Sequence, residues 1–297
     1  MRQGMTSTMD LFKSALAALL CLLLASCGGG GGGSGGSSGG STPTVSTMQA
    51  SNTAYGRVMT VSVSGQALDQ GGLAMTVDNV CTNVTKLAGG SEFNQTFTCR
   101  VGSIGEFNMR VSDSGGGFLA SLSAVVPLPQ VTLTTSKGTI VVELDLVKAP
   151  ISVDNFLRYV TATPSYYNGT LFHRVEADTV VQAGGFITGL APKTAVNAPI
   201  ALESQNGLKN QRGSIGMARE VATAASATAQ FFFNLKDNPQ FDYQSASQPG
   251  FAVFGKVVAG LDVMDAIGAV PVRFDLTRNL ANVPVTEVLI TAASQTK

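Results

Sequence analysis

Few side chains in this 297-residue chain could carry chemistry. His173 is the only histidine, and the four cysteines leave no spare pair to complete a set of zinc ligands, so we expect no metal site. A Ser-His-Asp triad would have to use His173, and no Gly-x-Ser-x-Gly turn precedes a helical pattern. Phosphate-binding and dinucleotide-binding glycine patterns are absent from the sequence, and we therefore expect no cofactor.

Arg174 follows this histidine directly, and an arginine can act without forming a covalent bond. Its guanidinium is always charged, planar and rich in donors, which suits a fixed electrostatic role in a transition state. Glu176 and Asp178 come shortly after it and could pair with other groups in space, although solvated acids are the default interpretation. Taken alone, Arg174 could equally be a surface residue of a strand.

Six segments of the chain resemble, in order, segments of the cyclophilin family. They are Lys137-Gly138-Thr139-Ile140 with Ala149-Pro150 and Asn155-Phe156; Tyr167 through Val175; Gln182-Ala183-Gly184-Gly185-Phe186; Asn206 through Asn210 with Arg212 through Arg219; Ser226 through Phe232; and Phe251 through Val257. Their order and spacing hold over residues 131–293, and their lengths resemble the bacterial periplasmic branch. One such segment would be weak support, whereas six in order are strong.

The resemblance implies a peptidyl-prolyl cis–trans isomerase. The X-Pro bond isomerises over a barrier of about 18–20 kcal/mol because resonance makes its C–N bond partly double. A catalyst has to hold the proline ring, orient the preceding carbonyl and weaken the resonance. In the family an arginine does the last by donating a hydrogen bond toward the prolyl nitrogen, which favours a pyramidal nitrogen with less amide character.

The family's polar residues carry over to five positions of this sequence. Arg174 matches the catalytic arginine, and Gln182 matches the glutamine that orients the substrate carbonyl. Gln230 matches a second polar residue beside the arginine. Ala218 and Arg219 match the edge where the substrate backbone pairs with the protein. His173 is interpreted as a structural residue.

The resemblance also implies an apolar pocket for the proline ring. Its residues would be Thr179, Val180, Phe232, Gln240, Phe241 and Phe251. Phe232 matches the pocket floor and Phe241 its wall. The family usually has Pro-Gly-Phe-Met after the active-site strand, and here Thr179 and Val180 stand where the phenylalanine and methionine are expected. Losing an aromatic wall would remove about 1–3 kcal/mol of apolar contact.

The first residues predict export and a lipid anchor. The apolar stretch from Ala15 to Leu24 is too short to span a bilayer, which needs about 20 residues, and fits the h-region of a secretory signal. Leu24-Ala25-Ser26-Cys27 resembles the lipobox of bacterial lipoproteins. That resemblance implies removal of residues 1–26, acylation of Cys27 and, because Gly28 follows, the periplasmic face of the outer membrane. The alternative is an ordinary signal peptide with a chance cysteine.

Export also bears on the remaining cysteines. Cys21 would be lost with the signal and Cys27 would carry the lipid, which leaves Cys81 and Cys99 in an oxidising compartment where disulfides persist. We expect a bridge between these two residues, and two buried free thiols are the alternative. Residues 27–44 are mostly glycine and serine and predict a flexible tether, and its Gly/Ser stretch from Gly28 to Ser41 would have an average reach of about 20 Å.

Two folded units are expected after the tether. Short β-forming runs in residues 45–126 predict a small β-sandwich that loosely resembles an immunoglobulin-like domain. Pro127-Leu128-Pro129 marks the boundary. Residues 130–297 predict a mainly β unit, a closed antiparallel cyclophilin-like barrel with two capping helices. We expect one helix over Val153–Val160, with Ser152 as its N-cap, and another over Leu261–Ile267.

The sequence therefore predicts an isomerase that assists the folding of exported proteins at the bacterial cell envelope. Its partners would be proline-containing polypeptides and, through Cys27, a membrane. The balanced net charge argues against nucleic acid, and we expect a monomer. Two alternatives remain open. One is a proline-peptide-binding or chaperone module with weak catalysis, because of Thr179 and Val180. The other is a structural protein in which the N-terminal β unit carries the main role.

Overall fold

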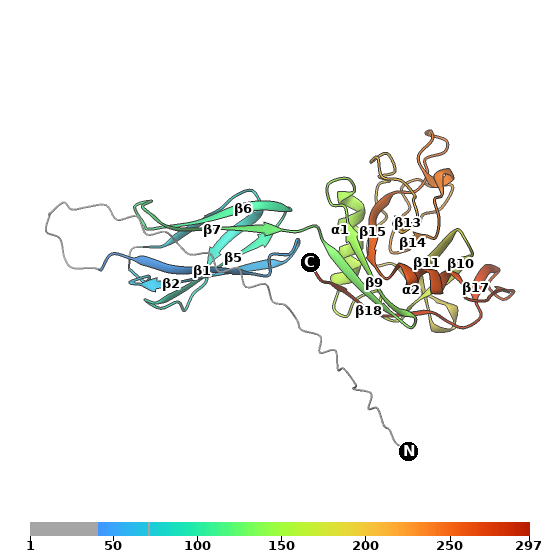
Figure 1. The fold of residues 1–297 in the computed structure, drawn as a ribbon, viewed down its shortest axis with the longest axis horizontal. Coiled ribbons are helices and arrows are strands. Elements are labelled where there is room, and N and C mark those ends of the chain that lie inside the picture. The colour runs from blue at the N-terminus through green and yellow to red at the C-terminus, as the bar shows by residue number, and fades with distance from the viewer. Residues whose placement is uncertain (1–40, 71) are drawn as a thin grey trace, which may run out of the picture.

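The computed structural model describes residues 41–70 and 72–297, and its strands fall into two groups that lie one after the other along the chain (Figure 1). Seven strands make up the first group: β1 (Thr44–Ser51), β2 (Val58–Gln66), β3 (Ala74–Val77), β4 (Cys81–Lys86), β5 (Asn94–Val101), β6 (Gly105–Ser112) and β7 (Phe118–Val126). One sheet has the order β1-β2-β5-β4, and the other has the order β3-β6-β7. This is the strand order of a constant-type immunoglobulin sandwich.

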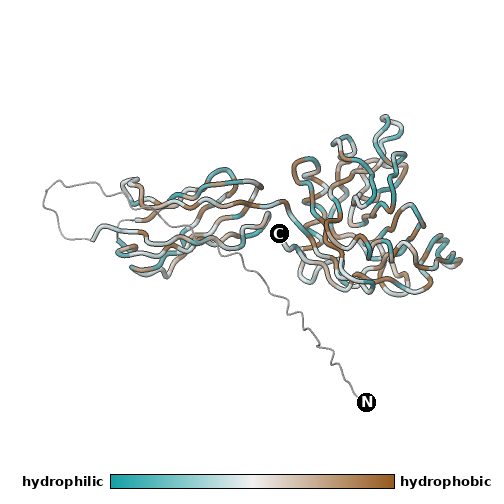
Figure 2. The backbone as a smooth tube through the Cα atoms, viewed as in Figure 1, coloured by the Kyte–Doolittle hydropathy of each residue, from teal (hydrophilic) through white to brown (hydrophobic). Residues whose placement is uncertain are grey.

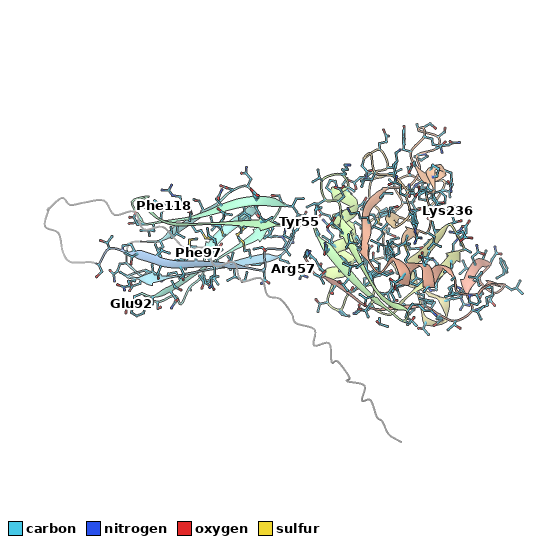
Figure 3. All side chains as sticks on the ribbon, in the orientation of Figure 1. Tyr55, Arg57, Glu92, Phe97, Phe118 and Lys236 are labelled. Carbon is cyan, nitrogen blue, oxygen red and sulfur yellow. A yellow bond between two sulfur atoms is a disulfide. The ribbon has the colours of Figure 1, made fainter. Side chains whose placement is uncertain are left out.

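The inner faces of these two sheets share one hydrophobic core. Alternate residues of β2 and β5 are buried, among them Val61 and Phe97, and β6 contributes Met109 in the same way. Figure 3 shows Phe97 between the two sheets and Phe118 on the outside. A disulfide joins Cys81 to Cys99. Since β4 and β5 are neighbours in one sheet, this bridge does not cross the core as an immunoglobulin disulfide does.

The second group of strands forms a closed barrel. Its strands are β8 (Gln130–Thr135), β9 (Gly138–Leu144), β10 (Thr170–Glu176), β11 (Val180–Ile187), β12 (Ala191–Pro192), β13 (Ser214–Met217), β14 (Phe231–Asn234), β15 (Val253–Ala259) and β18 (Leu289–Gln295). They pair in the order β10-β18-β8-β9-β15-β13-β14-β11-β12. An additional pairing of β10 with β11 closes eight of them into an antiparallel barrel. The predicted fold class, mainly β with a closed antiparallel barrel, is confirmed.

Two helices and a short hairpin complete this group. The helices are α1 (Pro150–Thr161) and α2 (Leu261–Gly268), and the hairpin pairs β16 (Val272–Asp275) with β17 (Leu280–Pro284). Two short 3-10 turns cover Thr188–Leu190 and Pro239–Phe241. Phe156 of α1 contacts Tyr167, Phe231 and Phe254 in the barrel core, with ring centroids 5.2–5.4 Å apart. Hydrophobic and hydrophilic residues alternate along much of the backbone in Figure 2.

The start of α1 differs from the expected one. The helix begins at Pro150, so Ser152 lies inside it and makes no side-chain cap. The free backbone donors of the first turn bind the Glu203 carboxylate instead: Ile151 N–H donates to Oε1 at 3.0 Å and Ser152 N–H to Oε2 at 2.7 Å. The Ser152 hydroxyl also donates to Oε2, at 2.6 Å. A residue far along the chain therefore supplies the cap, which sequence spacing could not reveal.

Replacing Glu203 with alanine is expected to lower the free energy of unfolding by about 1–2 kcal/mol, because it removes the acceptor of these first-turn donors. Urea unfolding at neutral pH measures the change. Glu106→Ala is the matched control, since Glu106 is an exposed glutamate of the sandwich. Equal midpoints for Glu203→Ala and the control would contradict this account of the helix start.

The two groups of strands touch at the loop between β1 and β2. Tyr55 from this loop packs against both hydrophobic cores. Its hydroxyl donates to Asp154 Oδ1 at 2.7 Å, and its carbonyl accepts from Gln295 Nε2 at 2.9 Å. Burial, followed by the bond to Asp154, raises the pKa of Tyr55 to about 12. Figure 3 places Tyr55 at the end of the sandwich that faces the barrel.

Within residues 41–70 and 72–297, no helix is both long and apolar enough to cross a membrane. The predicted signal segment and Cys27 lie outside the residues that the structure describes.

Candidate active site

Strand β10 carries Arg174, and an irregularity in its pairing with β11 sets the direction of that side chain. Phe172 pairs with Ala183 and Arg174 pairs with Gln182, so β10 has one extra residue, His173, at this point. Such a β-bulge re-aims the side chains that follow it. Phe172 and Val175 both enter the barrel core, although they would face opposite sides of a regular strand. Arg174 is left partly exposed at the surface.

A row of polar side chains begins at Arg174 and continues across the neighbouring strand. Arg174 forms an ion pair with Glu176, two residues along β10. Gln182 lies in register with Arg174, and its Nε2 donates to Gln230 Oε1 at 2.9 Å. A Cβ on Gly185 would lie 2.6 Å from the amide end of the Gln230 side chain, so any larger residue here would displace that amide. The structure therefore brings the predicted Arg174, Gln182 and Gln230 together.

Three aromatic rings lie on the side of Gln182 that is opposite Arg174. Phe232 of β14 is in register with Gln182 and is almost fully buried. Its ring centroid lies 6.2 Å from that of Phe241 and 5.6 Å from that of Phe251, and the centroids of Phe241 and Phe251 are 5.5 Å apart. All three pairs meet edge to face, an arrangement that aromatic rings prefer. We call Phe232, Phe241 and Phe251 the aromatic cluster.

Gly216 makes room for this cluster. It pairs with Phe232 across β13 and β14, and a Cβ at this position would lie 2.5 Å from Phe232 Cζ. Any side chain here would push the ring away. Gly216 occurs in a segment that resembles the family, but its contact with the ring depends on strand register, which the sequence does not state.

Glu176 was named from the sequence only as a carboxylate near Arg174. Its spacing of two residues from Arg174 places both side chains on one face of a strand.

The remaining predicted pocket residues contribute less apolar surface. Thr179 is held by its backbone: its carbonyl accepts from Leu235 N at 2.9 Å and from Asn238 Nδ2 at 3.0 Å. Its hydroxyl turns back to Ala177 O, at 3.4 Å. Val180 is buried at the start of β11. Gln240 is exposed and donates to Asn238 Oδ1 at 3.1 Å, which is its one side-chain hydrogen bond among the described residues.

Ala218 and Arg219 follow β13 at the edge of the same surface. Ala218 N donates to Gln230 O at 3.0 Å, which ties this segment to the polar row. The Arg219 guanidinium carbon lies 4.9 Å from the centroid of the Phe251 ring. The structure therefore places Arg219 against the aromatic cluster, in addition to the backbone role that the sequence implied.

His173 lies beneath the polar row and is 6% exposed. Its ring centroid is 4.6 Å from that of Phe186. Burial lowers the pKa of His173 to about 4, and the neighbouring charge of Arg174 adds to the effect. Nδ1 is the one buried side-chain polar atom among residues 41–70 and 72–297 that has no hydrogen-bond partner. A neutral, buried imidazole of this kind is consistent with the structural role expected of His173.

No group of three or more histidine, cysteine, aspartate or glutamate side chains in the described part of the chain is arranged to hold a metal ion. The arrangement instead offers a cationic donor, two amide side chains and an apolar aromatic surface side by side. Such a site can bind a ring, orient a carbonyl and stabilise a changing charge distribution.

Comparison with known proteins agrees with this chemistry. The sequence profile of the family described as "Cyclophilin type peptidyl-prolyl cis-trans isomerase/CLD" matches residues 130–294. A peptidyl-prolyl cis-trans isomerase of Acinetobacter baylyi is 44% identical over 177 residues, which cover 59% of this chain and 91% of the relative. The isomerase A of Dickeya dadantii is 46% identical over 55% of this chain and 82% of its own length.

A third relative, the isomerase B of Escherichia coli, is 46% identical over 47% of this chain and 84% of its own length. The profile match covers more than half of the chain and coincides with the closed barrel. The chain therefore belongs to the cyclophilin-type peptidyl-prolyl cis–trans isomerase family, and its function is peptidyl-prolyl cis–trans isomerisation.

Proposed function

We propose that Arg174, Gln182, Gln230 and the aromatic cluster form the site at which the barrel isomerises X-Pro bonds. The observation that carries this proposal is their register: Arg174 pairs with Gln182 and Gln182 with Phe232 across three neighbouring strands. A proline ring seated on Phe232 would place its nitrogen toward the Arg174 guanidinium. Substitution of Arg174, argued in the Discussion, tests this assignment.

In this mechanism no covalent intermediate forms. The aromatic cluster holds the ring and excludes water from one side of the bond, and Gln182 orients the carbonyl that precedes the proline. Arg174 then donates toward the prolyl nitrogen as the amide twists, because the nitrogen gains lone-pair character when resonance is lost. A donor fixed in this position stabilises the twisted state more than the planar one, which is the requirement for catalysis.

We also propose that the protein works on exported, proline-containing polypeptides at the periplasmic face of the cell envelope, as a monomer anchored through Cys27. The signal-like residues 1–26, the lipobox resemblance and the Gly/Ser-rich residues 27–44 support this location. The Cys81–Cys99 bridge suits an oxidising compartment. In cells given a labelled fatty acid, Cys27→Ser should abolish incorporation into the protein. Equal labelling of the two proteins would contradict the anchor.

Residues 45–126 are proposed as a spacer. The strand β1 begins at the end of the sandwich that is remote from the barrel, and the β1–β2 loop at the other end holds Tyr55 against Asp154 (Figure 1). An anchor that precedes β1 would therefore hold the barrel away from the membrane by the length of the sandwich.

A second candidate function, peptide binding with weak catalysis, is favoured by one observation. The Thr179 hydroxyl turns back to Ala177 O, so the side chain offers no apolar wall to a proline ring. Thr179→Phe is expected to raise kcat/KM for an Ala-Pro peptide by about 5- to 150-fold, since an added aromatic contact contributes about 1–3 kcal/mol. Proline-exchange NMR measures the rates of the wild-type protein and of the variant, and Thr179→Val is the control for loss of the hydroxyl. No gain over that control would count against this candidate.

A further inference from the structure

The surface beside the aromatic cluster carries a second arginine, Arg219, which has no carboxylate within 4.0 Å in the part of the chain that the structure describes. The Arg219 guanidinium lies over the Phe251 ring, 4.9 Å from its centroid, and Phe251 packs edge to face on both Phe232 and Phe241. A guanidinium at this distance from a ring face is attracted by the ring's electrons. Arg219 is therefore part of the rim of the proposed proline site.

Backbone carbonyl groups hold this guanidinium in one orientation. Arg219 Nε donates to Gly250 O at 2.9 Å, and Nη1 donates to Glu220 O at 2.8 Å and to Val221 O at 3.1 Å. Gly250 is itself fixed: its φ is +64°, and a Cβ there would lie 2.5 Å from Phe241 O. The arginine is thus ordered before any substrate arrives, and a binder loses little side-chain entropy against it.

Among the described residues, the guanidinium of Arg219 has no carboxylate partner. Arg174, Arg212 and Arg273 each lie within 4.0 Å of a carboxylate, but among residues 41–70 and 72–297 no carboxylate lies that close to Arg219. In the same residues its Nη2 makes no hydrogen bond, so two N–H groups stay available. A planar guanidinium with free donors matches the geometry of a carboxylate.

We propose that Arg219 makes this isomerase selective for substrates with an aspartate or glutamate one or two positions from the proline. The inference depends on the proposed site, because it places the proline ring on Phe232 beside Phe251. An extended chain advances about 3.3–3.6 Å per residue, so a side chain one or two residues from that ring reaches the cation over Phe251. The carboxylate would accept from Nη2 without displacing the three carbonyl groups.

The test compares peptides that differ at one position. The peptides are blocked at both ends and carry glutamate, glutamine or lysine either one or two positions from the proline. Exchange NMR with the full chain measures kcat/KM for each peptide. The glutamate peptide is expected to exceed the glutamine peptide by about tenfold at one of these positions, because a charged acceptor strengthens a hydrogen bond from a guanidinium. The ratio should shrink as salt is added, because salt screens exposed charges.

Three variants separate selectivity from structure. Arg219→Glu is expected to make the lysine peptide the preferred substrate. Arg219→Lys is expected to keep the preference for the glutamate peptide, with a smaller ratio of kcat/KM. Arg158→Gln, at an exposed arginine of α1, should leave the ratio unchanged. A structural role alone would lower the rates of all peptides by one factor and leave the ratios equal, which would overturn the inference.

The wild-type protein distinguishes the two possible failures without any variant. If the glutamine peptide is isomerised and the glutamate peptide is no faster at any position, the selectivity is refuted and the proposed site stands. If no peptide is isomerised, both are refuted.

Discussion

Replacing Arg174 with alanine is expected to lower kcat/KM for an Ala-Pro peptide by about 100- to 1,000-fold, the usual effect of removing one fixed donor to a transition state. The stability of the protein should change little, because the side chain is 39% exposed and its ion pair with Glu176 is at the surface. Exchange NMR on cis and trans proline signals measures the rate, and urea unfolding measures the stability.

Two further variants make this result specific. Arg174→Lys keeps the positive charge but loses the planar donor, and we expect it to recover only a small part of the activity. Arg158→Ala removes an exposed arginine of α1, outside the strands that carry the polar row, and we expect full activity. A rate for Arg174→Ala within a factor of two of wild type would remove Arg174 from the mechanism.

The second large effect concerns stability at low pH. Burial holds the pKa of His173 at about 4, whereas in the unfolded chain it would have its ordinary value of 6.5. Below pH 6.5 the unfolded state therefore binds a proton that the folded state does not, and folding stability decreases as the pH falls toward 4. One unit of pKa shift corresponds to about 1.4 kcal/mol, so the loss should reach about 3 kcal/mol.

His173→Asn isolates this effect, because His173 is the only histidine of the chain. The variant should be less stable than wild type at pH 7.5 because it loses the packing against Phe186. Its stability should then fall less steeply than that of wild type between pH 6.5 and 4.5. Carboxylates titrate in both proteins and cancel in the difference. Parallel profiles of unfolding free energy against pH would refute the assignment.

The regular parts of the barrel followed from periodic patterns. Apolar residues alternate on both sides of Ser136-Lys137, a pattern that is typical of a hairpin, and β8 and β9 pair there with Leu133 opposite Ile140. The expected helices lie within α1 and α2, each with slightly different ends. Local periodicity is sufficient for such elements because burial of one face decides them.

Features that depend on contacts between distant residues could not be predicted in this way. The cap of α1 comes from Glu203, and the space for Phe232 comes from Gly216. The extra residue at His173 in β10 is visible only once β11 is paired with it. Each of these depends on strand register or on a long loop, which sequence spacing does not fix.

In the candidate site, too, the positions of the residues could be predicted but their contacts could not. The resemblance located Arg174, Gln182 and Phe232 on segments that the structure brings into register. It did not indicate that Glu176 would pair with Arg174 or that Arg219 would lie on Phe251. Both contacts depend on how the strands and the segment after β13 fold together, which the order of the matching segments does not state.

The central claim is that the barrel surface around Arg174 catalyses prolyl isomerisation, and exchange NMR tests it most directly. The protein from Ser41 onward contains all the strands and helices described here and would be added in catalytic amount to an Ala-Pro peptide. We expect the exchange rate to rise in proportion to the amount of wild-type protein and to stay near the uncatalysed rate, on the scale of tens of seconds, with Arg174→Ala. An exchange rate that wild-type protein leaves unchanged would contradict the claim.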